Sequence, residues 1–278
     1  MSSIAAAFLD KSPAGGYNKI IRECSARSPQ KNVSATRRKV QTMATFAQKE
    51  EKTERIVQKL KELYPEAACA LEYRGEGWKL LVMGRLSAQC TDKRVNLVCE
   101  ELFRRYPTCR ALADGELSDI EALVRSCGCY RLKAANIKDA CAILCEKYGG
   151  EVPREMDELL ALPGVGRKIA NLLRGDLYHL PAIVADTHCI RLCERFGLTP
   201  DGCHDPVVTE RVMAELVPPE EQSDFCHRLV LFGRDCCTAR TPACTTCPLA
   251  DECKLPAQKF ASGSTKNPEP IRKKEKDT

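Results

Sequence analysis

The stretch from Arg154 to His188 reads REMDELLALPGVGRKIANLLRGDLYHLPAIVADTH, and it decides how the chain folds. Apolar residues recur at helical spacing in its first part, Arg154 to Ala161, and again after the turn Leu162-Pro163-Gly164-Val165-Gly166. Pro163 disfavours continuation of the first helix, while the two glycines permit a positive φ and the close approach of another chain. The sequence therefore predicts a helix, a tight glycine turn and a second helix.

The turn is a candidate anion site. Amides in the turn and in the first turn of the second helix have no intrahelical partner, and the positive end of the helix dipole lies beside them. A nucleic-acid phosphate fits such a site, which makes Gly164, Gly166 and the adjoining Arg167 candidate DNA contacts. An ordinary helix-helix turn is the alternative, because a Gly-x-Gly pattern alone is weak evidence.

Two side chains in the stretch can carry chemistry. Lys168 lies in the first turn of the second helix, where the dipole disfavours an ammonium and partial burial would lower the pKa further. A neutral lysine amine is a nucleophile that can form a Schiff base. Asp186 precedes a periodic apolar run and is placed to cap the helix that begins there. Capping alone would also explain Asp186.

The motif Leu162 to Lys168 followed by Asp186-Thr187-His188 resembles the helix-hairpin-helix and Gly/Pro…Asp signature of the endonuclease III family. The resemblance covers about residues 49–257. It implies that Lys168 and Asp186 are the catalytic pair of a DNA glycosylase that also cuts the strand.

A second block, Leu86-Ser87-Ala88-Gln89-x-Thr91-Asp92, resembles the same family. The resemblance implies that Gln89 enters the duplex and fills the space of an extruded nucleotide. Taken alone, Gln89 would be a solvated loop residue and Asp92 an N-cap. Where the family has a bulky aliphatic residue, Tyr and Asn, this chain has Cys129-Tyr130-Arg131. We therefore expect Gln89 to fill most of the space that the extruded nucleotide leaves, assisted by Tyr130 or Arg131.

Four cysteines near the C-terminus have metal-site spacing, Cys237-x6-Cys244-x2-Cys247-x5-Cys253. On spacing alone, zinc and an iron–sulfur cluster are both reasonable. The resemblance implies a [4Fe–4S] cluster, with Cys236, one residue out of register, as a non-ligand. Arg240 lies between the first two cysteines, as a candidate phosphate contact or an exposed surface arginine.

Composition bounds the class of protein. The 278 residues can bury a substantial core, and no apolar run approaches the roughly 18 residues that a membrane span needs. Most of the 18 cysteines are scattered singly through helical patterns, unlike those of disulfide-rich secreted domains. We expect a soluble, cytoplasmic and nucleoid-associated protein.

The net charge of +5 is unevenly distributed. Residues 1–42 hold 8 Lys+Arg against 2 Asp+Glu, and residues 254–278 hold 7 against 3, which leaves 28 against 33 between them. Attraction to a polyanion should therefore depend on the two ends of the chain. Met43 precedes the first strong helix, so residues 1–42 are either a basic arm or the product of a misassigned start.

The periodic segments predict an all-α fold without strands. Besides the hairpin, the expected helices are Glu50–Tyr64, Trp78–Ala88, a helix from Asp92 or Lys93 to Tyr106, Ser118–Ser126 with a capping box, Leu132–Tyr148, Thr187–Phe196, Pro206–Leu216 and Phe225–Phe232. The resemblance implies a helix-hairpin-helix DNA glycosylase fold of two helical lobes with a C-terminal iron–sulfur loop. The expected parts are a disordered basic extension 1–48, a helical barrel 70–180, an iron–sulfur domain 49–69 with 181–257, and a disordered basic tail 258–278.

The function that the resemblance implies is that of a bifunctional DNA glycosylase and AP lyase of base excision repair. It would act as a monomer on double-stranded DNA with damaged bases or abasic sites. Its substrates would be oxidised or ring-saturated pyrimidines, and it would cleave 3′ to the abasic site by β-elimination through a lysine Schiff base. The alternatives are a monofunctional glycosylase of the same superfamily and a non-catalytic DNA-binding or redox-sensing module.

Overall fold

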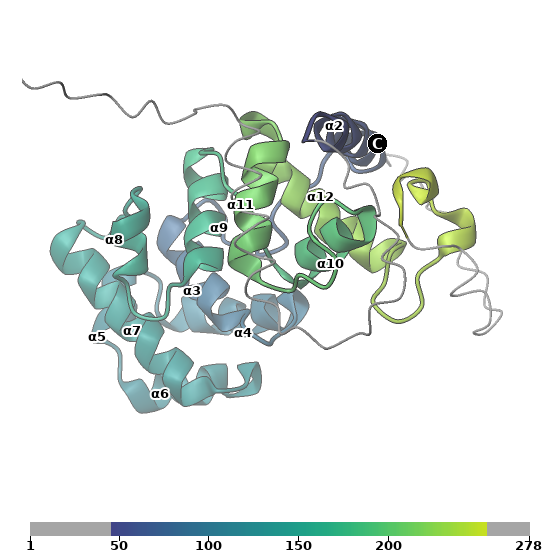
Figure 1. Ribbon diagram of the computed structural model, residues 1–278. Helices are drawn as coiled ribbons and strands as arrows, with labels where there is room; N and C mark the ends of the chain where they lie inside the picture. Colours follow the sequence, from purple (N-terminus) through teal and green to yellow (C-terminus); the bar gives the residue numbers. More distant parts are fainter. Residues whose placement is uncertain (1–45, 255–278) are drawn as a thin grey trace, which may run out of the picture. The chain divides into compact units, whose positions relative to one another are not determined.

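The computed structural model describes residues 46–254, and this part of the chain consists of helices and the turns that join them (Figure 1). Residues 46–254 contain no strand, so the predicted all-α class is confirmed. The predicted tail, and all of the predicted extension except residues 46–48, lie outside the described residues.

The chain divides into two compact units. One comprises Ala67–Val184 with Gln222–His227, and we call it the hairpin unit because it contains the glycine turn. The other comprises the described residues up to Glu66, Ala185–Glu221 and the described residues from Arg228, and we call it the cysteine-loop unit. Helix α12, Gln222–Asp235, is shared between them.

Helix α7 is central to the hairpin unit. It packs against α3, α5 and α6, while α3 also packs against α9 (Figure 1). The helices of this unit besides α12 are α3 Gly77–Leu86, α4 Asp92–Arg105, α5 Cys109–Asp114, α6 Leu117–Val124, the 3-10 turn η1 Arg125–Cys127, α7 Tyr130–Lys147, α8 Met156–Leu160 and α9 Arg167–Tyr178.

Apolar faces of these helices form one core. Leu80, Leu81, Leu102, Ile137 and Leu144 are completely buried in it. Fully burying a Leu or Ile side chain is worth about 1.5–3 kcal/mol, so this core is the main stabilising contribution to the unit that carries the glycine turn.

The cysteine-loop unit packs helix α11 against both α2 and α10. Its core includes Leu60, Phe196, Val212 and Phe232, all at most 1% exposed. Its elements besides α12 are α2 Phe46–Leu63, α10 Thr187–Phe196, α11 Pro206–Leu216, and the 3-10 turns η2 Pro219–Glu221, η3 Cys244–Thr246 and η4 Ala250–Glu252.

Some helix boundaries agree with the sequence because a local signal marks them. Asp186 caps α10, and Gly197 closes the same helix with a left-handed φ of 76°. Helix α11 spans Pro206–Leu216 as expected, with the Asp205 side chain accepting hydrogen bonds from two amides of its first turn. These caps depend only on neighbouring residues, which is why the sequence reveals them.

Other boundaries were wrong. Helix α2 begins at Phe46 and so includes residues 46–48, which we had assigned to the extension. The expected cap Asp92 lies inside α4, because the Thr91 side chain accepts the hydrogen bond from the Arg94 amide. The capping box at Ser118 does not form, because α6 already begins at Leu117 and no side chain caps it.

Helix α5, Cys109–Asp114, was not expected at all. It is too short for apolar periodicity to reveal, although the Thr108 side chain caps it by accepting from the Ala111 amide at 3.1 Å.

Over residues 46–254, no helix combines the length and the apolar character that crossing a membrane requires.

Candidate functional site

The glycine turn joins α8 to α9 as predicted. The Leu162 amide donates to the Leu159 carbonyl and the Val165 amide to the Leu162 carbonyl, each at 3.1 Å, which folds the chain back on itself. Gly164 has a φ of 75°, in the left-handed region that side chains with a Cβ rarely adopt. A Cβ at Gly164 would also lie 2.5 Å from Nε of Arg85. Glycine is therefore required there by both conformation and space.

Gly166 has a different role, because its φ is −103° and a Cβ at this position would meet nothing within 4 Å. It is the N-cap of α9, and no side chain caps the helix there. The amides of the first turn, the helix dipole and the open space beside Gly166 together make a place where an anion can approach the backbone. Arg167 is exposed at the start of the same turn.

Lys168 is the second residue of α9, and its side chain is exposed. From the sequence we considered that the Lys168 amine would be partly buried, and that expectation was wrong. An exposed amine at the first turn of the helix can reach a substrate that approaches the open Gly166 end.

The chain that leads from α9 to Asp186 has no regular secondary structure, and hydrogen bonds hold it in the hairpin unit. Asn171, on the same helix as Lys168, is 4% exposed and donates from Nδ2 to the Ile183 carbonyl at 3.0 Å. The Val184 amide donates to Sγ of Cys226 at 3.2 Å. The backbone immediately before Asp186 is thus fixed by buried contacts.

Asp186 is half-buried, and its Oδ1 accepts a hydrogen bond from the Cys189 amide at 2.8 Å. The capping role expected from the sequence is confirmed. Because the cap uses one carboxylate oxygen, capping does not exclude a second role for the other. Lys168 belongs to the hairpin unit and Asp186 to the cysteine-loop unit.

The residues expected to fill a base stack lie in two places in the hairpin unit, the loop after α3 and the start of α7. Gln89 is exposed after the end of α3, with a φ of 55°. Cys129 is exposed, with a φ of 45°, and immediately precedes α7. Arg131 is exposed, and its guanidinium carbon lies 5.3 Å from the centre of the half-buried Tyr130 ring, so the two side chains present one combined surface.

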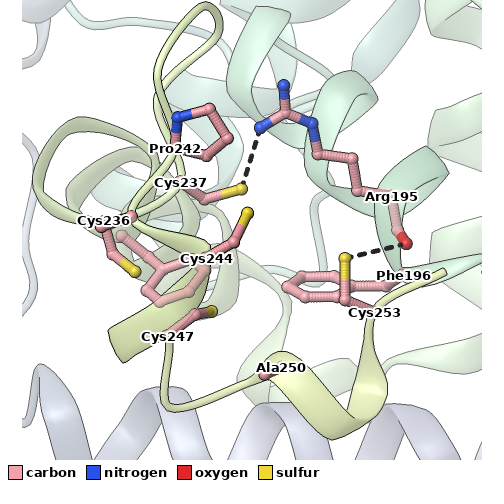
Figure 2. Close-up of a pocket in the computed structure, with 11 residues that line it drawn as sticks. Arg195, Phe196, Cys236, Cys237, Pro242, Cys244, Cys247, Ala250 and Cys253 are labelled. Carbon is pink, nitrogen blue, oxygen red and sulfur yellow. Dashed lines mark hydrogen bonds between the residues drawn. The ribbon is translucent and has the colours of Figure 1, made fainter. Parts of the chain in front are cut away.

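A pocket in the cysteine-loop unit is lined by five cysteines, Cys236, Cys237, Cys244, Cys247 and Cys253. Figure 2 shows the sulfur atoms of Cys237 and Cys244 facing that of Cys253 across the pocket. Apolar side chains, including Phe196 and Phe232, form part of the wall. Thiolate sulfur in an apolar setting is the donor set of a zinc site or an iron–sulfur cluster, so the residues present fit such a group.

The thiols are spread around the pocket. Within residues 46–254, no three His, Cys, Asp or Glu side chains gather closely enough to hold a single metal ion. The cysteines of a cluster bind different iron atoms and are set further apart than the ligands of one ion. Cys236 lies beside Cys247, and the hydrogen bond between their side chains lowers the pKa of the Cys247 thiol.

Two arginines of α10 hold the loop that carries these cysteines. Arg195 donates from Nη1 to Sγ of Cys237 at 3.0 Å (Figure 2). The same Nη1 donates to the Thr238 carbonyl at 2.8 Å. Arg191 donates from Nη2 to the Cys237 carbonyl at 3.1 Å. The far end of the loop returns to the same helix, where the Lys254 amide donates to the Arg195 carbonyl at 2.8 Å. Arg240 is exposed on this loop.

Sequence reasoning missed Asn171, Arg191 and Arg195. The two arginines lie one turn apart on α10, which places them on one face of the helix, and this spacing was the available signal. Nothing in the sequence marks the partner of Asn171, because Ile183 contributes only its backbone carbonyl.

Comparisons with known proteins agree with this geometry. A family model described as "HhH-GPD superfamily base excision DNA repair protein" matches residues 82–219. A second, described as "Iron-sulfur binding domain of endonuclease III", matches residues 237–253, which begin at Cys237 and end at Cys253.

Curated relatives carry the same name. Endonuclease III of Synechocystis sp. is 44% identical over 209 residues, which are 75% of this chain and 94% of the relative. Endonuclease III of Bacillus subtilis is 39% identical, over 75% of this chain and 94% of the relative. Endonuclease III of Escherichia coli strain K12 is 36% identical, over 72% and 93%.

Solved structures give the same result. A non-covalent endonuclease III–DNA complex matches with a TM-score of 0.71 at 39% identity, over 76% of this chain and 97% of that chain. A thermostable thymine-DNA glycosylase, at 23% identity and a TM-score of 0.66, shares the fold. With its hairpin, its cysteine loop and this similarity over nearly the whole length of its relatives, the chain belongs to the endonuclease III family of base excision repair, DNA glycosylase/AP lyases that hold a [4Fe–4S] cluster.

Proposed function

We propose that this protein removes oxidised or ring-saturated pyrimidines from double-stranded DNA and then cleaves the strand 3′ to the abasic site. The observation that carries the proposal is the position of Lys168, an exposed amine at the uncapped first turn of α9 beside the open Gly166. Such an amine can attack a sugar carbon that is presented at the helix end. The substrate also includes duplexes in which the base is already lost.

Base removal begins with a nucleotide that has been extruded from the stack. The lone pair of Nζ of Lys168 forms a bond to C1′ of the sugar. The bond between C1′ and the base breaks, and the base leaves with that electron pair and a proton. The carboxylate of Asp186 stabilises the positive charge that develops on the sugar and assists the proton transfers.

Strand cleavage uses the same intermediate. Ring opening converts the adduct into a Schiff base between Nζ of Lys168 and C1′, which acidifies the proton on C2′. Loss of that proton leaves an electron pair that forms the C2′–C3′ double bond while the C3′–O bond breaks. The phosphate departs on the 3′ side, and hydrolysis of the Schiff base returns the lysine.

DNA contacts follow from the exposed groups of the hairpin unit. The backbone at Gly164 and Gly166, together with Arg167, binds a phosphate at the start of α9. Gln89 fills the space of the extruded nucleotide, and the Tyr130 and Arg131 surface assists by stacking.

Cys237, Cys244, Cys247 and Cys253 would hold the cluster, and Cys236 would remain a neighbouring thiol. The cluster supplies a rigid crosslink of the loop, which would fix Arg240 for a phosphate contact. The protein would act as a monomer, in the cytoplasm and close to the nucleoid.

Borohydride trapping on a duplex with a single oxidised pyrimidine tests the proposal. Reduction of the Schiff base should link wild-type protein covalently to DNA, while Lys168→Gln should give neither an adduct nor strand cleavage yet still bind abasic duplex. Arg167→Gln is the matched control: it removes a neighbouring charge, so it should bind more weakly but still form the adduct at saturating protein. Undiminished trapping with Lys168→Gln would refute the assignment, and base removal without any trapping in the wild type would favour a monofunctional glycosylase.

A further inference from the structure

Lys133 is a buried lysine that the mechanism above does not use. It lies in the first turns of α7, and only 2% of its surface is exposed. A buried ammonium is costly unless hydrogen bonds satisfy its three protons. Lys133 meets this condition, because its Nζ donates to the carbonyls of Leu86 at 2.9 Å, Ala88 at 2.6 Å and Cys127 at 2.5 Å.

The three acceptors belong to two different segments. Leu86 is the last residue of α3 and Ala88 follows two residues later, so these carbonyls lie at the negative end of a helix dipole. Cys127 is the last residue of η1, far along the chain from α3. A single side chain thus ties the end of α3 to the segment that leads into α7.

Soon after each of the two segments that Lys133 joins, a residue other than glycine has a positive φ. Gln89, directly after Ala88, has a φ of 55°, and Cys129, two residues after Cys127, has a φ of 45°. Residues with a Cβ adopt this left-handed region at a cost in conformational energy, so neighbouring contacts must hold them there. The hydrogen bonds of Lys133 reach the residue directly before Gln89 and the residue two positions before Cys129.

We propose that Lys133 is a positioning residue for base extrusion, which holds Gln89 and the Cys129–Tyr130 segment at a fixed spacing so that both enter the duplex together. The inference rests on the proposed function, because it takes the filling role of Gln89 from there. Lys133 itself does not touch DNA, since it is buried beneath the two loops. It acts through the backbone that it ties.

The same helix supplies a matched control. Lys138 is also on α7 and donates from Nζ to the carbonyls of Ala113 at 2.5 Å and Gly115 at 2.8 Å, at the C-terminal end of α5. Replacing Lys138 removes the same kind of contact from the same helix but ties neither loop. Lys133→Met and Lys138→Met both keep most of the apolar stem and lose the ammonium.

The test is single-turnover base removal from two duplexes, one with the lesion paired and one with it mispaired and therefore easier to extrude. Lys133→Met should slow removal from the paired duplex on the order of tenfold or more, as misplacement of binding groups does, and from the mispaired duplex much less. Strand cleavage of a preformed abasic duplex, which has no base to extrude, should change least. Lys138→Met should leave the ratio of paired to mispaired rates at the wild-type value.

A double variant separates this inference from the proposed function. If Lys133 acts through Gln89, Lys133→Met should add little to the paired-lesion defect of Gln89→Ala. A Gln89→Ala protein with normal rates on both duplexes would overturn the filling role itself. Normal extrusion in Lys133→Met together with a defective Gln89→Ala would overturn only the positioning role, as would equal slowing on all three duplexes.

Hydrogen exchange of the wild-type protein gives a test that needs no variant. The amides of residues 88–91 and 127–130 should become exchangeable in one common opening, with similar opening free energies, because the same ammonium holds both segments. Segments that open independently, with clearly different protection, would overturn the inference even if Lys133→Met does not fold.

Discussion

Nε of Arg85 lies 2.5 Å from the position that a Cβ at Gly164 would take. The same guanidinium donates to Oδ1 of Asn136, from Nε at 3.0 Å and from Nη2 at 2.9 Å. The glycine turn is therefore fitted to a side chain that cannot simply move away without losing its own partner.

Gly164→Ala and Gly166→Ala should differ in kind. The first adds a Cβ at positive φ against Arg85 and should lower the free energy of unfolding by about 2–4 kcal/mol. The second places a methyl group in open space at an ordinary φ, so it should leave stability within about 0.5 kcal/mol of the wild type but weaken binding to abasic duplex several-fold. Urea unfolding and fluorescence anisotropy measure the two effects, and equal destabilisation by both changes would contradict the packing described here.

Asp186→Asn separates capping from catalysis. Asn caps helices about as well as Asp, so the hydrogen bond to the Cys189 amide and the melting temperature should be nearly preserved. The loss of the carboxylate charge should reduce base removal on the order of a hundredfold or more. Asp205→Asn, which changes the cap of α11 in the same way, is the control and should retain full activity. If Asp186→Asn turns over normally, Asp186 is only a cap.

Arg195→Met should loosen the cysteine loop. The change removes the hydrogen bonds to Sγ of Cys237 and to the carbonyls of Thr238 and Ala239. At roughly 1 kcal/mol or more for each bond, the free energy of unfolding should fall by about 2–4 kcal/mol. Bound iron should be lost faster on exposure to oxygen. Arg110→Met, which breaks only an exposed ion pair with Asp114, should change neither quantity. Iron retention equal to that of the wild type would show that the cluster ligands alone hold the loop.

Cysteine substitutions should distinguish ligands from the neighbouring thiol. Cys244→Ser should abolish the broad absorption near ~400 nm that thiolate-bound [4Fe–4S] clusters give, because it removes one ligand. Cys236→Ser should keep it, although Cys236 lines the same pocket. Iron and sulfide analysis of anaerobically prepared protein measures both, and loss of the cluster from Cys236→Ser would show that the ligand set is shifted by one residue.

Lys49 should make stability depend on pH. It is 8% exposed, and burial, with a smaller contribution from the charge of Lys254, lowers its pKa from 10.5 to about 8. Between these values the unfolded chain holds more protons than the folded one, so the contribution of Lys49 to stability rises with pH. Relative to Lys49→Met, the wild type should gain up to about 1.4 kcal/mol per pH unit from pH 8 toward 10, measured by urea unfolding. Parallel pH profiles would contradict this.

Several features that the sequence predicted correctly depend only on neighbouring residues. Asp186 caps α10 through an amide three residues away, and Gly197 ends the same helix through its own φ, so both could be identified from the sequence alone. The family motifs located the glycine turn and the cysteine loop for the same reason, since each is a continuous segment.

What the sequence could not predict depends on which face of a helix is turned inward. We expected a helix from Leu132, and no motif in its sequence singled out Lys133. The helix begins instead at Tyr130, and it leaves Leu132 61% exposed while Lys133 is 2% exposed. The partners that make this burial possible are backbone carbonyls far away in the chain, and no residue type identifies those.

The return of Lys254 to α10 has a consequence for how the cluster is assembled. The side chain of Arg195 holds the start of the cysteine loop, and its backbone carbonyl accepts the amide that ends it, so one residue closes the loop at both ends. The bonds from Arg195 to the Thr238 and Ala239 carbonyls, and from the Lys254 amide to Arg195, need no metal. Much of the entropic cost of closing a loop of this length is therefore met by folding, not by cluster assembly. Iron and sulfide therefore bind to a loop whose ends are already joined. The four ligand thiols are then close together before the cluster forms, which disfavours clusters on other thiols of a chain that contains 18 cysteines.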